Sequence, residues 1–152
     1  MNIFVIGDYL GAGIQFPLIK YQITYMGSMA ITIFRDITYI LNGVYTNKTT
    51  LSVIVWVLGV LVLVLGIVII WVKIDKNNNN LKLTGILIIT SAFLFLSSTI
   101  IQYGPLFKGP AGLAIPIGLP VLFVIGGWMY HEGCKEKEAD KVESEQEFVD
   151  EI

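Results

Sequence analysis

Two adjacent charged residues, Arg35 and Asp36, stand in the otherwise moderately apolar first fifty residues of the chain. Charges inside a membrane are costly and mark contacts with ions, solutes or headgroups. Tyr39 lies one helical turn beyond Arg35, and Asp8 is a further carboxylate able to pair with it. Arg35, Asp36, Asp8 and Tyr39 are therefore the candidate ligand-binding residues. The alternative interpretation is a structural ion pair, or an interfacial helix whose charges meet water.

No other group of residues has the composition and spacing of a catalytic, metal-binding or phosphate-binding site. His131 and Cys134 are the only residues of their kinds, and two ligands do not complete a zinc site. The three glycines of segment 7–13 do not have the spacing of a phosphate-binding loop. We expect no metal, no cofactor and no catalytic residue, so the chain is predicted not to be an enzyme; an enzyme acting on lipid ranks last among the hypotheses.

The composition predicts a membrane protein. Of 152 residues, 55% are hydrophobic and only 14% are charged, whereas soluble domains carry about 25% charged residues. The mean hydropathy is +0.72. The residues after Tyr130 include nine acidic and three basic side chains, and such an acidic tail does not seek nucleic acid. Membrane lipid is the expected partner, and no nucleic acid is expected to bind.

Three long segments carry no Asp, Glu, Lys or Arg: residues 51–72, 83–101 and 112–130. Each is close to the ~20 residues that a helix needs to cross a bilayer. The connection from Lys73 to Lys82 is polar enough to be a solvated turn. Pro116 and Pro120 predict a kink in the third of these spans.

Residues 21–44 allow two interpretations. Polar side chains recur there at steps of three and four, at Tyr21, Tyr25, Ser28, Thr32, Arg35 or Asp36, Tyr39 and Asn42. This period favours an amphipathic helix, and strict alternation fails at residues 26–28 and 35–36. In the other interpretation the residues before Leu51 form a layer outside a three-helix protein, partly strand, because residues 22–32 are rich in Ile, Thr and Tyr. The periodicity argument favours the helix.

The predicted fold is therefore an all-α, four-helix transmembrane bundle. Residues 1–20 form an N-terminal segment, interfacial or re-entrant; residues 21–130 form the transmembrane domain with spans 21–44, 51–72, 83–101 and 112–130; residues 131–152 form an acidic cytoplasmic tail. Lys and Arg in short loops accumulate on the cytoplasmic side, which places both termini there. The predicted location is the cell membrane, as a multi-pass protein.

Small residues predict how the helices pack. Ser52, Gly59 and Gly66 repeat every seven residues, as do Thr84, Ser91 and Ser98. Small residues let membrane helices approach closely, so the two stripes suit an antiparallel pair. The function expected from these features is that of a homo-oligomer or an accessory subunit of a membrane complex. The alternative is a small channel or carrier that uses the polar face around Arg35 and Asp36.

Overall fold

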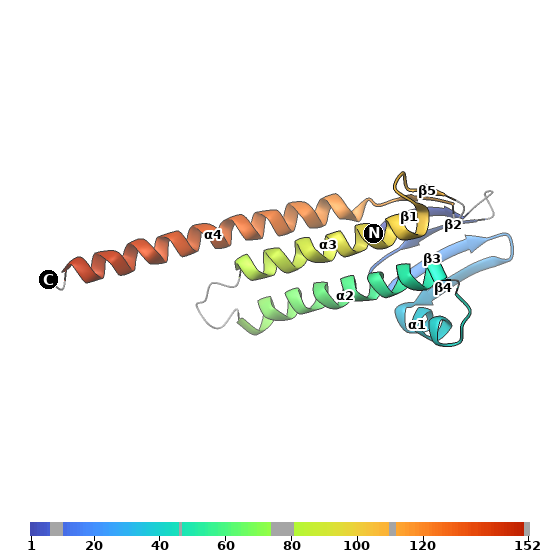
Figure 1. Ribbon diagram of the computed structural model, residues 1–152, viewed down its shortest axis with the longest axis horizontal. Helices are drawn as coiled ribbons and strands as arrows, with labels where there is room; N and C mark the ends of the chain where they lie inside the picture. The colour runs from blue at the N-terminus through green and yellow to red at the C-terminus, as the bar shows by residue number, and fades with distance from the viewer. Residues whose placement is uncertain (7–10, 46, 74–80, 110–111, 151–152) are drawn as a thin grey trace.

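The computed structural model describes residues 1–6, 11–45, 47–73, 81–109 and 112–150, and it describes the side chains of these residues except at 72–73 and 136–150. It has both helices and strands (Figure 1). The strands are β1 (Asn2–Ile6), β2 (Gly11–Gln15), β3 (Ile19–Thr24), β4 (Gly27–Thr32), β5 (Lys108–Gly109) and β6 (Gly112–Ile115). The helices are α1 (Ile33–Leu41), α2 (Asn47–Lys73), α3 (Leu81–Tyr103) and α4 (Gly118–Asp150).

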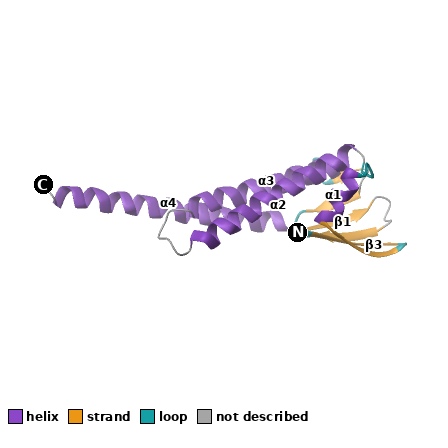
Figure 2. Ribbon diagram, turned by 90° about the horizontal axis from the view of Figure 1, so that it is seen from below, coloured by secondary structure: helices purple, strands orange, loops and turns teal. Residues whose placement is uncertain are grey.

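The strands form one antiparallel sheet in the order β4-β3-β2-β1-β6-β5. The first four follow one another as a meander, and β6 joins the free edge of β1. Glycine allows the close packing of β2: a Cβ on Gly13 would lie 2.4 Å from the Phe4 ring and 2.4 Å from the carbonyl oxygen of Tyr21. The sheet lies at one end of the helices, as both views show (Figure 1 and Figure 2).

The all-α prediction is wrong, and so is the predicted helix over residues 21–44. The segment forms β3, β4 and the nine-residue helix α1. The interruption of alternation at residues 26–28 falls at the turn of the β3–β4 hairpin. Tyr25 and Met26 form the turn, and Gly27, the first residue of β4, has φ +127°, a conformation open mainly to glycine. The pairing Thr24↔Gly27 closes the hairpin next to the turn. The strand content that the alternative interpretation predicts for residues 22–32 is confirmed by β3 and β4.

The predicted span 112–130 also needs correction. Its first residues form strand β6, and α4 begins only at Gly118. Pro116 therefore precedes the helix, and Pro120 lies in its first turn, where the missing N–H costs no helical hydrogen bond. The predicted kink has no proline in the helix interior to cause it. Among the described residues two helices, α2 and α3, are long and apolar enough to cross a membrane.

The predicted antiparallel contact between the two small-residue stripes is confirmed. At one end of the α2–α3 pair the Ser52 and Ser98 side chains meet, and at the other Gly66 lies against Leu87 and Ile88. Between them, a Cβ on Gly59 would lie 2.9 Å from the Phe95 ring. Gly59 therefore provides the space that this aromatic ring occupies.

Helix α4 packs antiparallel along the other side of α3. A Cβ on Gly85 would lie 2.7 Å from the carbonyl oxygen of Gly126, and one on Gly133 would lie 2.3 Å from the backbone nitrogen of Lys82. The Phe93 and Phe123 rings meet edge to face with centroids 5.1 Å apart. The α3–α4 contact thus depends on bare backbone at its closest points, as helix packing in lipid does.

Two clusters join the sheet to the bundle. Phe4, Tyr103 and Ala114 are buried together where β1 and β6 meet the end of α3. Trp56, one and a half turns beyond Leu51 in α2, is buried against Phe95 and donates a hydrogen bond from Nε1 to the carbonyl oxygen of Pro17 at 3.1 Å. The β2–β3 loop is therefore fixed to the side of α2.

Candidate functional site

Two adjoining cavities, of about 30 and 60 Å³, lie where β2, β3 and α1 meet the start of α2 and the end of α3. Polar residues shared by their linings are Gln15, Lys20, Asp36, Ser52 and Ser98; Tyr45, Thr49, Thr99 and Gln102 line the larger one. We call this set the polar cavity. It gathers side chains from both the sheet and the helices, and it is the strongest candidate for a functional site.

Asp36 forms the acidic wall of the polar cavity. The hydroxyl of Tyr45 donates a hydrogen bond of 2.5 Å to Asp36 Oδ1, and the Tyr45 ring packs edge to face on Tyr39. Burial, together with this hydrogen bond and the negative charge of Asp36, raises the pKa of Tyr45 well above its ordinary value. Tyr45 therefore stays protonated and remains a donor to Asp36.

Lys20 is the cationic group of the polar cavity. It lies on β3, with Nζ 5.2 Å from the centroid of the Phe4 ring. Burial lowers the pKa of Lys20 below its ordinary value, and the charge of Asp36 opposes that shift. A lysine and a carboxylate thus face the same small space, and the Phe4 ring near Lys20 Nζ also attracts the cation.

Helix side chains form the remaining wall. Ser52 Oγ donates to the carbonyl oxygen of Ser98 at 2.9 Å, and Ser98 Oγ donates to that of Ser52 at 2.8 Å. Asn2 Nδ2 donates to Thr99 Oγ1 at 3.2 Å. The Oε1 atom of Gln102 is buried without a hydrogen-bond partner among the described atoms. Because a buried amide oxygen without a partner is costly, a water molecule is the expected partner of Gln102.

The four residues predicted from the sequence have different positions. Asp36 faces the polar cavity, whereas Arg35 is exposed and donates from Nε to the Tyr39 hydroxyl at 2.7 Å. Arg35 and Tyr39 thus pair on the surface of α1, and their contact with a ligand stays a prediction. Asp8 lies outside the described residues. Their adjacency in sequence does not make Arg35 and Asp36 one site.

Sequence reasoning missed the cationic and amide members of the polar cavity. The candidate residues predicted from the sequence do not include Lys20, Tyr45 or Gln102. One signal was present: Lys20 is the only charged residue between Asp8 and Arg35, in a stretch rich in β-branched and aromatic residues. If a strand of this composition packs against helices, a lysine on its buried face needs a polar or charged partner, because an unpaired buried charge is costly.

The arrangement suits binding of water-sized groups more than catalysis. The Ser52 and Ser98 hydroxyls already donate to backbone carbonyls, so neither is poised as a nucleophile. Among the described residues no three His, Cys, Asp or Glu side chains are grouped to hold a metal. Fold and site together define an antiparallel sheet joined through a polar cavity to helices of membrane-spanning length. Comparison of the chain with protein families, curated proteins and solved structures finds no match.

We expect Lys20→Met to raise the midpoint of thermal unfolding near neutral pH, because burial disfavours charged Lys20 in the folded state. The unfolded chain keeps this proton up to the ordinary pKa of 10.5, whereas the folded chain releases it at lower pH. The stability of the wild type therefore rises with pH between the lowered pKa of Lys20 in the folded chain and its ordinary pKa of 10.5. Over this pH range the difference in unfolding midpoint between Lys20→Met and the wild type becomes smaller. Circular dichroism melts at several pH values, with exposed Lys48→Met as control, measure this difference. A Lys20→Met variant that is less stable at neutral pH would show that attraction to Asp36 outweighs burial.

Proposed function

We propose that the chain is a non-enzymatic integral membrane protein that serves as a subunit of a homo-oligomer or of a larger membrane complex. The observation that carries the proposal is the outer surface of α2. Only 22% of its most apolar stretch is buried. The exposed side chains include Leu58, Leu61, Val64, Leu65, Ile67 and Val68. A core helix of a water-soluble protein would bury such residues, and so large an exposed apolar surface needs lipid or protein to cover it.

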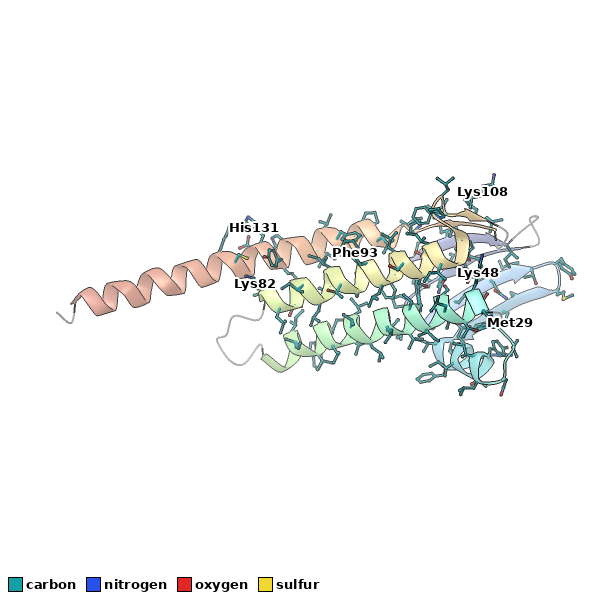
Figure 3. The ribbon with its side chains drawn as sticks, viewed as in Figure 1. Met29, Lys48, Lys82, Phe93, Lys108 and His131 are labelled. Atoms are coloured by element: carbon teal, nitrogen blue, oxygen red, sulfur yellow. The ribbon has the colours of Figure 1, made fainter. Side chains whose placement is uncertain are left out.

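The distribution of charge supports a bilayer as that cover. Lys48 and Lys108 lie at the sheet end of the bundle, and Lys82 and His131 lie at the opposite end, with Phe93 between them (Figure 3). Between Lys48 and Lys73, α2 contains no Asp, Glu, Lys or Arg. Its 27 residues extend about 40 Å at 1.5 Å per residue, enough to cross a hydrocarbon core of about 30 Å.

Orientation follows from lysines near the ends of the helices. Lys73, Lys76 and Lys82 lie in or beside the α2–α3 connection, and Lys135 follows the apolar part of α4. The positive-inside rule places this end in the cytoplasm. In the proposed topology the acidic tail is cytoplasmic, and the sheet lies on the other side of the membrane. Because β1 belongs to the sheet, this topology replaces the sequence-based expectation that both termini are cytoplasmic.

The exposed edge of the sheet supports a role as a subunit. Strand β4 is an edge strand of six residues, Gly27–Thr32, that carries neither charge nor proline. Soluble proteins usually protect such edges with charges, proline or covering elements. The side chains of Met29 on β4 and of Tyr25 and Met26 in the preceding turn are exposed. A partner strand or apolar surface would cover both features.

The channel or carrier alternative loses its main support. It required residues 21–44 to cross the membrane with Arg35 and Asp36 at mid-depth, but these residues form a hairpin and a short helix at the sheet end. The proposal therefore keeps the subunit role alone.

Native mass spectrometry of the full chain after gentle extraction tests the subunit role. We expect a defined oligomer or a stoichiometric complex with another membrane protein, because β4 and the exposed hairpin need a cover. Met29→Lys, which places a charge on the edge strand β4, is expected to weaken that assembly, whereas Lys108→Met on the opposite edge strand β5 is expected to leave it intact. A well-behaved monomer for the wild-type chain at all concentrations would contradict the proposal.

A further inference from the structure

An apolar groove of about 330 Å³ lies beside the polar cavity, between the helices at the end that carries the sheet. Trp56 and Leu63 of α2 form one wall, Leu119 and Leu122 of α4 form the other, and Phe95 of α3 lies between them. Pro17, on the β2–β3 loop, lies at the sheet end of the groove. Both walls continue onto exposed apolar surface, at Leu61 on α2 and at Val121 and Val124 on α4.

Water is a poor occupant of this groove. A buried water needs about two to four polar partners. Two polar side chains in the lining are already paired: Trp56 Nε1 donates to the Pro17 carbonyl oxygen, and Asn2 Nδ2 donates to Thr99. Met1 adds a backbone nitrogen beside Gly118, and one such group does not supply the partners that a buried water needs. The remaining named walls are hydrocarbon or aromatic. An apolar occupant is therefore favoured.

The dimensions exclude a membrane-crossing helix of a second copy. Such a helix is about 10–12 Å wide with its side chains and runs the full thickness of the bilayer. The β2–β3 loop, held at Pro17 by Trp56, closes the groove at its sheet end, so a helix could not continue past it. A hydrocarbon chain is narrower and can enter from the side. The volume is roughly twice that of a cavity of ~150 Å³ that binds benzene.

We infer that an acyl chain of a bilayer phospholipid occupies the groove between α2 and α4, in the half of the membrane nearest the sheet. The inference rests on the proposed membrane location. The bilayer surrounds both exposed walls and supplies acyl chains at high concentration, so the groove is filled without a further protein. The bound acyl chain would contact α2, α4 and the β2–β3 loop and hold them together.

Brominated phospholipids test this occupant, because bromine atoms quench a tryptophan that they contact. The chain has three tryptophans, so the double variant Trp71→Phe/Trp128→Phe reports on Trp56 alone, and Trp56→Phe/Trp71→Phe reports on Trp128. Trp56 is only 6% exposed and Trp128 is 64% exposed. In vesicles of phosphatidylcholine brominated on one acyl chain, we expect both reporters to lose most of their fluorescence, although Trp56 is shielded from surrounding lipid.

A narrowed groove provides the matched comparison. Leu63→Phe with Leu122→Phe, added to the Trp56 reporter, is expected to restore much of its fluorescence, whereas Val124→Phe outside the groove is expected to leave the quenching unchanged. Quenching of Trp128 without quenching of Trp56 would overturn the acyl-chain inference and leave the membrane location standing. Absence of quenching at both tryptophans would overturn the membrane location and the inference together.

Discussion

Leu61→Arg in the middle of α2 is expected to remove most of the protein from the membrane. Leu61 is 54% exposed and points away from the bundle interior, so in water an arginine there would change stability by only about 0.5 kcal/mol. At the centre of a bilayer the same arginine costs about 2.5–3.5 kcal/mol. The fraction of the protein that resists alkaline extraction from membranes measures the effect.

Met26→Arg is the matched control for this substitution. Met26 is also an exposed apolar residue, but it lies in the turn of the β3–β4 hairpin at the sheet end. The proposed location places it in water, so we expect normal membrane insertion of this variant. Equal insertion of Leu61→Arg and wild type would contradict a lipid-facing α2.

Gly85→Leu is expected to separate α4 from α3. A Cβ at this position would lie 2.5 Å from the backbone nitrogen of Tyr130 and 2.7 Å from the carbonyl oxygen of Gly126. Both neighbours are backbone atoms and cannot move aside without shifting the helix. Overpacking typically costs about 1–3 kcal/mol, and a clash with backbone atoms belongs at the upper end of this range. Unfolding by increasing denaturing detergent, followed by helical circular dichroism, measures the loss of stability.

Gly127→Ala is the control for Gly85→Leu. A Cβ at Gly127 would have no neighbour within 4 Å, and alanine favours a helix by roughly 0.5–1 kcal/mol over glycine. We therefore expect unchanged or slightly higher stability. Comparable destabilisation by both substitutions would contradict the close α3–α4 contact.

The helical hairpin could be predicted from sequence because its signals are local. Residues 51–72 and 83–101 are uncharged over a membrane-spanning length, and the seven-residue repeats fix which faces meet. The predicted contact of Ser52, Gly59 and Gly66 with α3 followed from one rule, that small residues allow close approach. This rule needs no knowledge of the rest of the fold.

The sheet could not be predicted in the same way because its pairings are distant in sequence. Strand β6 pairs with β1 across more than one hundred residues, and nothing in Gly112–Ile115 distinguishes a short apolar strand from the start of a membrane helix. In residues 21–32 the spacing of Tyr21, Tyr25 and Ser28 fits a helix as well as a hairpin. Gly27 was the deciding residue, because its position in the middle of the segment suits a turn.

The candidate site was predicted only in part for the same reason. Asp36 was identified because a carboxylate in an apolar segment is rare. Its neighbours Lys20, Tyr45 and Gln102 come from three separate elements that only the fold brings together. Arg35 does not line the polar cavity although it is adjacent to Asp36 in sequence, because adjacent residues on a helix face different directions.

Cysteine labelling at the two ends of the bundle tests the central claim most directly. Tyr25→Cys at the β3–β4 turn and His131→Cys on α4 are both at exposed positions, and Cys134→Ser removes the native thiol from each. With a membrane-impermeant maleimide, we predict that Tyr25→Cys is labelled in intact cells and that His131→Cys is labelled only after permeabilisation. Labelling of both cysteines under the same condition would contradict a bundle that crosses the membrane between them.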